Sequence, residues 1–438
     1  MNLRPYQTEA VAAIFQQWEK QRSTLLILPT GTGKTICFAA VVRQLIEQGK
    51  RVLILAHREE LLNQAAEKIE HTTGLKCAVE KAEQTTLDSW FNITVGSVQT
   101  LQNQKRLARF PRDYYDAMVI DEAHHAVSSS YRAVINYFAG AKLLGVTATA
   151  DRGDKRNLGE VFDSVAYEYT LRKAIQAGYL VPIRALTLPV KINLTGVKTQ
   201  GGDYQASALG SALDPYLESI ADALAVHAAG RKTVVFLPLI ATSQKFCAML
   251  NRRGIRTSEV NGESADRSVK LEAFHRGEFD VLCNSMLLTE GWDEPLVDCV
   301  VVLRATKVRS LWAQMVGRGT RLSPGKKDLL LLDFLWHTEK HDLCRPAHLL
   351  CKEEDLSAQV AEKMAEIEGE VDLLEMTDDL TGDAIAEREE ALKRELEAQK
   401  KRKRKLVDPL QYEMSISSDG KCWNYEEDPT DLKAIMPP

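Results

Sequence analysis

Short apolar, β-branched segments alternate with amphipathic stretches over the first 170 residues. The amphipathic stretches include Lys34–Gln48 and Glu59–His71, which are predicted to be helices. The predicted buried strands are Thr24–Leu28, Arg51–Ala56, Ile93–Val95, Ala117–Ile120 and Leu143–Val146. Because strands that alternate with helices form parallel sheets covered on both faces, this part of the chain is predicted to be an α/β domain.

The alternation stops after about Pro182 and resumes near Tyr216. Residues 191–213 contain four glycines and show no firm period, so residues 183–215 are predicted to be a connector or insertion. The second alternating region consists of helix Tyr216–Ala229, strands Thr233–Leu237, Val281–Asn284 and Asp298–Leu303, helix Ser310–Val316 and strand Leu329–Asp333. The pattern therefore predicts two parallel-sheet domains, over residues 1–182 and 216–350.

Residues 351–438 differ in composition from the two domains. The segment 353–390 has a net charge of −13, and a charged helical stretch, Ala384–Leu406, ends in the basic run Lys400–Lys405. The net charge of −5 therefore conceals about +7 on residues 1–352, and it argues only weakly against an anionic partner. The basic run fits either a solvated helix end or a phosphate-binding arm. Trp423 and Tyr425 nearby are candidates for base stacking.

Composition also limits the class of protein. No apolar run reaches the roughly 18 residues that would span a bilayer. The first residues lack the apolar stretch of a signal peptide, and the eight cysteines form no short paired spacing. These observations favour a cytosolic, reduced protein without a membrane partner.

A glycine-rich loop, Pro29–Thr35, stands between a predicted strand and a predicted helix. Its glycines let backbone N–H groups close around phosphate oxygens, and the helix N-terminus adds a partial positive charge. Lys34 is expected to bridge the β- and γ-phosphates of ATP, and the Thr35 hydroxyl to bind Mg²⁺. The predicted loop contacts to ATP are Thr30, Gly31, Thr32, Gly33, Lys34 and Thr35.

An acidic tetrad, Asp121-Glu122-Ala123-His124, follows the apolar strand Ala117–Ile120. A carboxylate at a strand end can lie beside the bound Mg²⁺, and the next carboxylate can orient or deprotonate the attacking water. Thr35 and Asp121 are thus predicted to be Mg²⁺ ligands, and Glu122 the water-activating residue. Such a tetrad alone is commonly a solvated loop, but together with the phosphate loop it indicates ATP hydrolysis.

These motifs and several blocks between them resemble the superfamily-two DEAD/DEAH-box helicases over roughly residues 3–345. Leu28, where the full phosphate-loop consensus has glycine, matches the helicase variant of the loop. Within the superfamily, the chain most resembles bacterial RadD-type DNA repair helicases and related phage-borne or restriction-type helicases. The resemblance implies an α/β fold: two tandem RecA-like parallel-sheet lobes with a charged, mainly helical C-terminal extension.

The resemblance also implies roles for residues near ATP. Leu3–Gln7 resembles the adenine-reading block, in which Gln7 would hydrogen-bond the adenine edge and Arg4 would lie against the base. Leu288–Pro295 resembles the block that touches ribose and strand, and Gln314–Arg321 resembles the arginine-finger block. The further ATP contacts implied are Arg4, Gln7, Gly291, Asp293, Arg318 and Arg321, and the catalytic set is Lys34, Asp121, Glu122, Arg318 and Arg321.

The two arginines of the finger block lie three positions apart. Arg318 and Arg321 are therefore expected to share one helical face, so that both could point into the cleft. Guanidinium groups delivered across the cleft would neutralise charge that develops on the γ-phosphate.

Three further blocks are assigned through the same resemblance. Residues 55–61 and 95–101 resemble the strand-binding blocks of the first lobe, where strand-to-helix turns present hydroxyls and N–H groups to a phosphate backbone. Residues 147–149 resemble the block that couples ATP state to lobe movement. The predicted nucleic-acid contacts are His57, Arg58, Ser97, Gln99, Thr100 and Thr289, and the predicted coupling residues are His124, Thr147, Thr149 and Gln314. From the residues alone, Ser97, Thr100 and Arg58 would more often be ordinary helix starts.

A cluster of histidines and cysteines follows the last predicted strand: His337, His341, Cys344, His348 and Cys351. These spacings would suit zinc, but the cluster has no Cys-x2-Cys pair. RadD-like proteins can carry a cysteine-rich zinc module at this place, and this chain lacks that pattern. Zinc is therefore not expected, and the cluster is interpreted as the edge of a surface helix that contacts nucleic acid through His341.

The sequence thus predicts an ATP- and Mg²⁺-dependent helicase or translocase that binds ATP between two lobes. Its expected partner is single-stranded or partly duplex nucleic acid, and the preference for DNA rests on the resemblance alone. Two alternatives remain open. One is an RNA helicase, and the other is a nucleotide-gated remodeller that translocates without unwinding and holds a protein partner through its tail.

Overall fold

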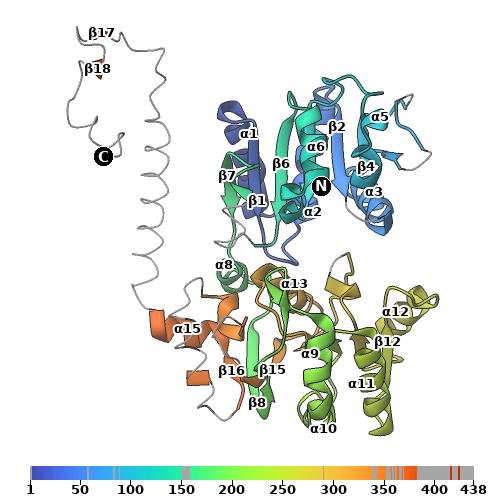
Figure 1. Ribbon diagram of the computed structural model, residues 1–438, viewed down its shortest axis with the longest axis vertical. Coiled ribbons are helices and arrows are strands. Elements are labelled where there is room, and N and C mark those ends of the chain that lie inside the picture. The colour runs from blue at the N-terminus through green and yellow to red at the C-terminus, as the bar shows by residue number, and fades with distance from the viewer. Residues whose placement is uncertain are drawn as a thin grey trace. The chain divides into compact units, whose positions relative to one another are not determined.

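The computed structural model describes most of the chain. The described residues are 2–56, 59–81, 84–87, 89–149, 158–289, 291–337, 343–351, 357, 360, 363–364, 367, 369–381, 415–416 and 423–424. The chain separates into a compact unit, Met1–Leu380, and a second unit, Thr381–Pro438. The first unit holds two lobes, each built on a seven-stranded sheet (Figure 1). Both are RecA-like, as predicted.

The sheet of the first lobe has the order β3-β4-β2-β5-β6-β1-β7, and all of its strand pairs are parallel. Its strands are β1 (Ser23–Ile27), β2 (Val52–Ala56), β3 (Ala78–Glu80), β4 (Ile93–Ser97), β5 (Ala117–Asp121), β6 (Lys142–Thr147) and β7 (Ser164–Glu168). Both faces of the sheet are buried: Leu53 and Leu55 of β2 pack into one core cluster, and Val52 and Ile54 pack into the other. This double burial explains why the strands are continuous apolar runs in the sequence.

Helices cover this first sheet on both faces. They are α1 (Pro5–Lys20), α2 (Lys34–Glu47), α3 (Glu59–Thr73), α4 (Val98–Leu101), α5 (Gln104–Leu107), η1 (Ala123–Val127), α6 (Ser129–Tyr137) and α8 (Leu171–Gln176). The first helix begins at Pro5, where the missing N–H of proline costs nothing. It buries a stripe at helical spacing that includes Ala10, Ile14 and Trp18. The predicted helices Lys34–Gln48 and Glu59–His71 correspond to α2 and α3.

The second lobe repeats the architecture with the order β12-β13-β11-β14-β15-β8-β16. Its strands are β8 (Ile183–Asn193), β11 (Thr233–Phe236), β12 (Thr257–Val260), β13 (Val281–Asn284), β14 (Cys299–Val302), β15 (Leu329–His337) and β16 (Val371–Asp372). Its helices are α9 (Ala206–Leu213), η2 (Asp214–Tyr216), α10 (Leu217–His227), α11 (Ile240–Arg252), α12 (Arg267–His275), η3 (Leu287–Thr289), α13 (Arg309–Gly317), η4 (Pro346–Leu349) and α15 (Leu373–Thr381). Only β16 runs antiparallel to its neighbour among the strands described in this sheet.

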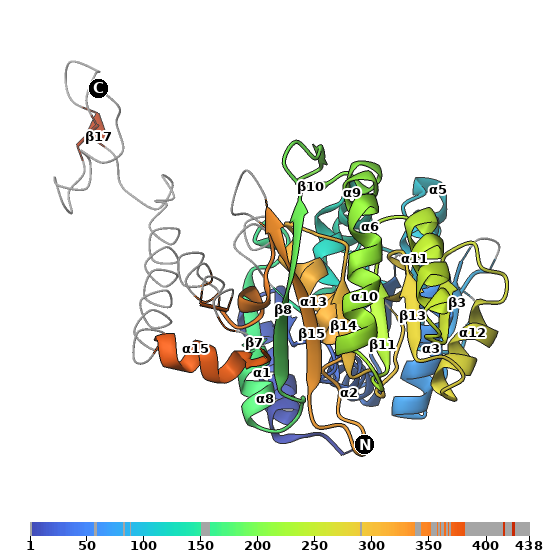
Figure 2. The same ribbon diagram turned by 90° about the horizontal axis from the view of Figure 1, so that it is seen from below.

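The connector predicted over residues 183–215 is wrong for its first part, because β8 is a strand of the second sheet. It runs beside β15 and pairs with it in parallel from Ile183 to Asn193 (Figure 2). The register shifts between Leu188 and Lys191, so that Pro189 and Val190 have no partner residue in β15. A proline and a bulge interrupt the alternation along the strand, which is why no period was visible in the sequence. The rest of the segment forms a two-stranded hairpin, β9 (Thr199–Gln200) and β10 (Asp203–Tyr204), followed by α9.

Part of the acidic segment belongs to the first unit instead of a separate tail. Val371 of β16 pairs with Ala185 of β8, and Leu373 of α15 is fully buried in the core. The side chain of Arg172 in α8 donates a hydrogen bond of 2.9 Å to the Thr377 hydroxyl of α15. The predicted tail boundary at residue 351 is therefore too early.

The second unit contains one described hairpin, β17 (Ser415–Ile416) paired antiparallel with β18 (Trp423–Asn424). The predicted charged helix Ala384–Leu406, with the run Lys400–Lys405, and Tyr425 lie outside the described residues. Among the residues that are described, no helix combines the length and hydropathy that a membrane crossing requires.

Candidate nucleotide and nucleic-acid sites

The glycine-rich loop joins the carboxyl end of β1 to the first turn of α2. Gly31 and Gly33 have φ angles of 87° and 84°, a conformation that residues with a Cβ rarely adopt. The Thr32 hydroxyl donates to the Pro29 carbonyl at 2.7 Å, and the loop turns back on itself there. A Cβ at Gly33 would lie 2.6 Å from Nε2 of Gln7, so a side chain there would displace the end of the Gln7 side chain. The loop has the backbone expected of a phosphate-binding turn.

Strand order brings the predicted catalytic residues to the same edge of the sheet. The loop follows β1, the acidic tetrad follows β5, and Thr147 ends β6, which lies between β1 and β5. Since these strands are parallel, their carboxyl ends lie side by side, where ligands of open α/β sheets usually bind.

The Glu122 side chain contacts residues of both lobes. Its Oε1 accepts a hydrogen bond of 3.0 Å from Nζ of Lys34, and its Oε2 accepts one of 3.1 Å from Nε2 of Gln314 in the second lobe. Nδ1 of His124 lies 3.6 Å from the same Oε2. Two predicted coupling residues thus contact the predicted water-activating carboxylate, and one of them comes from the other lobe.

The backbone at Glu122 is left-handed, with a φ of 52°. A residue other than glycine, asparagine or aspartate seldom adopts this conformation, which costs on the order of 1 kcal/mol. The N–H of Glu122 donates to Oδ1 of Asp121 at 3.0 Å, and this bond holds the Asp121 carboxylate. Strain of this kind often accompanies a functional role for the side chain.

The two carboxyl groups have opposite pKa shifts. Burial, with a further contribution from the Glu122 carboxylate, raises the pKa of Asp121. Burial would also raise the pKa of Glu122, but the positive charges of Lys34, His124 and Arg318 together hold that pKa below its usual value. Glu122 is therefore the member of the pair that stays ionised most readily, as a residue that orients or deprotonates water must.

The donors predicted for Mg²⁺ are of the right kind. Asp121 offers a partly buried carboxylate at the end of β5, and Thr35 offers a hydroxyl in the first turn of α2. Oxygen donors from one or two protein groups, completed by water and phosphate oxygens, are what Mg²⁺ ordinarily takes. The raised pKa of Asp121 would fall if a divalent cation supplied positive charge beside it.

The amino-terminal block closes the site from the side of α1. Nε2 of Gln7 donates to the Thr32 carbonyl at 3.0 Å, and Oε1 of Gln7 accepts from the Arg4 N–H at 2.9 Å. The Arg4 guanidinium lies over the ring of Tyr179, 4.9 Å from its centroid. The predicted adenine-contacting residues therefore lie against the phosphate loop.

Aromatic residues that the sequence reasoning missed support this block. The Tyr6 hydroxyl donates to the Thr32 carbonyl at 2.6 Å, and the Tyr6 ring stacks on Tyr169 with centroids 4.3 Å apart. Tyr179 packs on the other rings at 4.9 Å from Tyr6. Tyr6 stood inside the recognised block, but Tyr169 and Tyr179 are far from it in sequence and no local pattern marks them.

Arg318 and Arg321 do not share a helical face, so this part of the prediction is wrong. Helix α13 ends at Gly317, and the Thr320 hydroxyl donates to the Gly317 carbonyl at 3.0 Å in the turn that follows. A Cβ at Gly319 would lie 2.3 Å from the Leu329 side chain, so Gly319 permits a close packing of this turn on β15. The two arginines leave the turn in different environments.

Arg321 contacts the phosphate loop directly. A Cβ at Gly31 would lie 3.0 Å from Cγ of Arg321, and a Cβ at Gly317 would lie 2.7 Å from Cβ of Thr30. Nε of Arg321 pairs with the Asp293 carboxylate at 3.0 Å. Burial lowers the pKa of Arg321, and the neighbouring Asp293 carboxylate opposes that shift. An arginine keeps its proton under such a shift and remains a cation at the loop.

Arg318 lies in the interior of the second lobe and is 6% exposed. Its guanidinium donates to the backbone carbonyls of Thr289 and Trp292. These carbonyls flank Gly291, whose φ is 73°. In this arrangement Arg318 supports the segment that carries Asp293, the ion-pair partner of Arg321.

Among the predicted nucleic-acid contacts, Ser97 lies at the end of β4. It is the register partner of Ala56, the last residue of β2. The Ser97 hydroxyl donates to Oε1 of Gln99 at 2.9 Å, and the block continues through Thr100. In the second lobe the Thr289 hydroxyl donates to the Met286 carbonyl at 2.8 Å. His57 and Arg58 lie outside the described residues.

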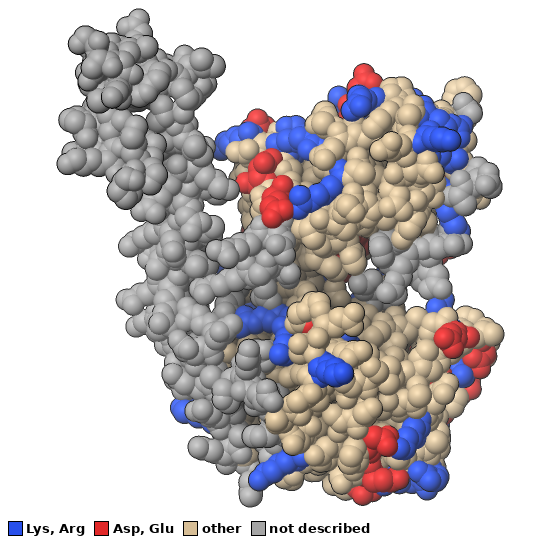
Figure 3. Space-filling model, in the orientation of Figure 1, with Lys and Arg blue, Asp and Glu red and all other residues tan. Residues whose placement is uncertain are grey.

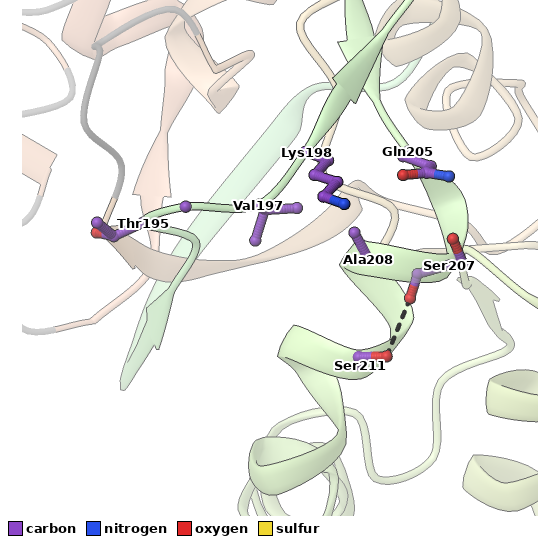
Figure 4. A pocket seen from close by; sticks show the side chains of 8 residues that line it. Thr195, Val197, Lys198, Gln205, Ser207, Ala208 and Ser211 are labelled. Atoms are coloured by element: carbon purple, nitrogen blue, oxygen red, sulfur yellow. Dashed lines mark hydrogen bonds between the residues drawn. The ribbon is translucent and has the colours of Figure 1, made fainter.

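Neither the surface charges in Figure 3 nor the hollow in Figure 4 identifies where nucleic acid binds. On the face in Figure 3, lysines and arginines of both lobes lie among aspartates and glutamates. A hollow of about 530 Å³ lies beside the hairpin of the second lobe (Figure 4) and shares no residue with the nucleotide site. Its lining residues are Thr195, Gly196, Val197, Lys198, Gln205, Ser207, Ala208 and Ser211.

The coupling block ends β6. The Thr147 hydroxyl donates to the Thr149 carbonyl at 3.0 Å, which folds the block into a turn. The Thr149 hydroxyl oxygen is buried and has no hydrogen-bond partner among the described residues. A buried hydroxyl of this kind is available for a contact that forms in another state of the site.

The histidine–cysteine cluster has a different structure from the one expected. His348 is not at a surface helix edge: its Nδ1 accepts from the Arg345 N–H at 2.8 Å, and its Nε2 lies 3.0 Å from the Ser357 hydroxyl. Burial, with a contribution from Arg309, lowers the pKa of His348 to about 4. Cys344 and Cys351 are buried, and His341 lies outside the described residues. Within the described part of the chain, no three His, Cys, Asp or Glu side chains gather as metal ligands would.

Two family models match this chain. The model described as the res subunit of type III restriction enzymes matches residues 1–152, and the model described as the helicase conserved C-terminal domain matches residues 216–323. The two matches cover the part of the first lobe that holds the phosphate loop and the acidic tetrad, and the part of the second lobe that holds the arginine block.

Curated relatives and solved structures agree with these matches. The chain is 29% identical over 393 residues to IRC3 of Saccharomyces cerevisiae, whose name describes an ATP-dependent helicase; the match covers 84% of this chain and 57% of that protein. It is 25% identical over 379 residues to the EcoAI endonuclease subunit of a type I restriction enzyme from Escherichia coli, covering 77% of this chain and 46% of that protein. The chain thus spans about half the length of these relatives. A fragment described as the HsdR subunit of a type I restriction enzyme from Vibrio vulnificus superposes with a TM-score of 0.59 at 25% identity, covering 76% of this chain and 64% of that chain.

Proposed function

Because the chain belongs to the superfamily-two helicases, we propose that it is a motor that hydrolyses ATP between its lobes and moves along nucleic acid. The observation that carries the proposal is the position of Glu122. It contacts Lys34 of the phosphate loop and Gln314 of the second lobe at the same time. A carboxylate that touches both sides of the cleft can link a change at the γ-phosphate to the separation of the lobes.

Each group of residues at the nucleotide site has its own role in ATP hydrolysis. The backbone N–H groups of the loop bind phosphate oxygens. When ATP binds, Lys34 leaves its ion pair with Glu122 and pairs with the phosphates instead. Glu122 then orients the attacking water and takes up its proton. Arg321 supplies positive charge from the second lobe, against Gly31 of the loop. Thr35 and Asp121 would hold Mg²⁺, which would supply positive charge to the phosphates.

DNA is the proposed substrate. The support is the likeness to restriction-enzyme subunits, whose names place them among DNA-cleaving enzymes. The experiment compares ATP turnover with single-stranded DNA, duplex DNA, forked DNA and RNA of matched length. Stimulation by DNA above RNA is expected, and stimulation by RNA alone would establish the alternative of an RNA helicase. The RadD-type likeness, a role in DNA repair and a cytosolic location stay predictions.

The basic run Lys400–Lys405 is proposed to be a phosphate-binding arm. Deleting residues 400–438 is expected to weaken nucleic-acid binding while ATP turnover without nucleic acid stays nearly unchanged, because the catalytic residues all precede residue 322. Each lost phosphate contact should flatten the slope of log K against log salt by about 0.7 for a single strand, up to a change of about 4 for the whole run.

Binding isotherms at several salt concentrations measure this effect. A variant that keeps residues 400–438 but replaces Lys400–Lys405 with glutamine is the matched control, because it removes the charge alone. An unchanged slope in both proteins would show that the run is a solvated helix end or a docking site for another protein.

A further inference from the structure

A buried carboxylate outside the recognised blocks holds the start of helix α13. Asp203 lies at the beginning of β10, in the hairpin that follows β8. Its Oδ2 accepts hydrogen bonds from the Thr306 hydroxyl at 2.9 Å and from Nη2 of Arg304 at 3.3 Å. Its Oδ1 accepts from the Lys307 N–H at 2.9 Å. One side chain therefore binds three groups of a single turn, residues 304–307.

The network is shielded from water. The side chains of Asp203 and Arg304 are 13% and 12% exposed, and Thr306 is 1% exposed. Hydrogen bonds to a carboxylate in such surroundings are stronger than neutral ones and fix direction as well as distance. A solvated surface pair would not hold a turn in one geometry.

The turn that Asp203 holds leads directly into α13. The Thr306 hydroxyl, which donates to Asp203, also accepts from the N–H of Val308, the N-cap residue of that helix. Helix α13 begins at the next residue and carries Gln314, which donates to Glu122 across the cleft. The helix is nine residues long. Trp312, Met315 and Val316 pack it into the core, and the turn 304–307 holds its beginning. Its far end leads through Gly317 to Arg321.

The same carboxylate is connected to the segment behind Arg318. Nε of Arg304 lies 3.0 Å from Sδ of Met286, whose backbone is left-handed with a φ of 60°. The Met286 carbonyl accepts from the Thr289 hydroxyl, and the Thr289 carbonyl accepts from Arg318. Asp203 is thus bonded to the turn that leads into α13, and Arg304 links this turn to the segment that carries Thr289.

The hairpin is also attached to the second lobe through Tyr204. The strands of the hairpin contain two residues each, and among the described residues they pair only with each other. Tyr204 is buried in the core of the second lobe, and Nζ of Lys307 lies over its ring at 4.9 Å from the centroid. The hollow in Figure 4 lies along the same hairpin, lined by Lys198 and Gln205.

We propose that Asp203 is a positioning residue for ATP hydrolysis: it sets the orientation of α13 and so places Gln314 and Arg321 against the first-lobe site. The inference rests on the proposed function, because its readout is ATP turnover. It assigns catalytic importance to a hairpin that lies outside the helicase blocks of the sequence.

The test is Asp203→Asn, which keeps the size of the side chain but turns one acceptor oxygen into a donor that faces Arg304 and Thr306. We expect kcat for ATP to fall on the order of ten- to a hundredfold, with KM for ATP unchanged, as a small displacement of catalytic groups would produce. Asp214→Asn is the matched control, because Asp214 lies in the same connecting region but pairs with Lys245 on the surface, where it is 52% exposed. The control should retain parental kcat.

A double-mutant cycle separates positioning from a general loss of stability. If Asp203 acts through α13, adding Asp203→Asn to a Gln314→Ala protein or to an Arg321→Ala protein should cost less than it costs the parent in at least one of the two cycles. Full multiplication of the effects in both cycles, or a rise in KM with kcat intact, would overturn the proposal. Thr306→Val, which removes one of the three donors, gives the same cycle if Asp203→Asn does not fold. A parent without ATP turnover would instead refute the proposed function, so the two failures are distinguishable.

Discussion

A Glu122→Gln protein is expected to bind ATP as the parent does and to hydrolyse it on the order of a hundred to ten thousand times more slowly, the usual contribution of a general base. Glutamine keeps the size of the side chain and can still face Gln314, but it cannot take a proton from water. Binding should survive, because Lys34 and the loop N–H groups hold the phosphates. In the protein without nucleotide, the same change removes the ion pair between Lys34 and residue 122.

Single-turnover hydrolysis and equilibrium binding of a fluorescent ATP analogue measure the two quantities separately. Glu47→Gln is the matched control, since Glu47 pairs with Arg43 on the surface of α2 and is 60% exposed. Lys34→Ala should show the opposite pattern and lose binding, because the loop then has no lysine for the phosphates. Parental turnover in Glu122→Gln would remove Glu122 from the water-activating role.

The second large effect is expected for Arg321→Ala, with a loss of kcat on the order of a thousandfold and little change in ATP affinity. Arg321 lies against Gly31 of the phosphate loop, where a cation meets charge that develops in the transition state. Arg252→Ala is the control, because Arg252 is a surface residue of the same lobe with 69% exposure. An effect confined to KM would mean that Arg321 binds ATP without acting on the transition state.

Arg318→Ala should differ from Arg321→Ala in kind. Arg318 is buried and donates to the carbonyls of Thr289 and Trp292, so its removal leaves these acceptors without that donor. We expect a decrease in the free energy of unfolding of about 1–3 kcal/mol in addition to slower turnover. Thermal or denaturant unfolding of both variants distinguishes them. An Arg318→Ala protein as stable as the parent would contradict the supporting role.

The first lobe could be predicted closely because its signals are local. Lys34 follows a buried strand and a glycine turn, and Asp121 is the last residue of a second buried strand. The predicted strands and the sequence motifs therefore indicated the same site. The apolar runs of the parallel strands identified β1, β2 and β5 to within one or two residues, since each is buried on both faces. Such strands need no information from the rest of the chain.

The errors arose where distant contacts decide the structure. β8 is recognisable only through its pairing with β15, because Pro189 and Lys191 break its alternation. Arg318 and Arg321 point to different surroundings because Gly319 lets the turn pack against Leu329. A rule based on helical spacing cannot predict this contact. Asp203 carries no local signal at all, because its three donors are about one hundred residues away in the sequence.

The central claim is that hydrolysis between the lobes drives movement along a strand. The most direct measurement is the ATP-dependent displacement of streptavidin from a biotinylated single strand, for the nucleic acid that stimulates turnover most and with biotin at either end. We predict rapid displacement from one end by the parent with ATP, and none by Glu122→Gln or without ATP. If the parent hydrolysed ATP on the strand and displaced streptavidin from neither end, the protein would not be a motor.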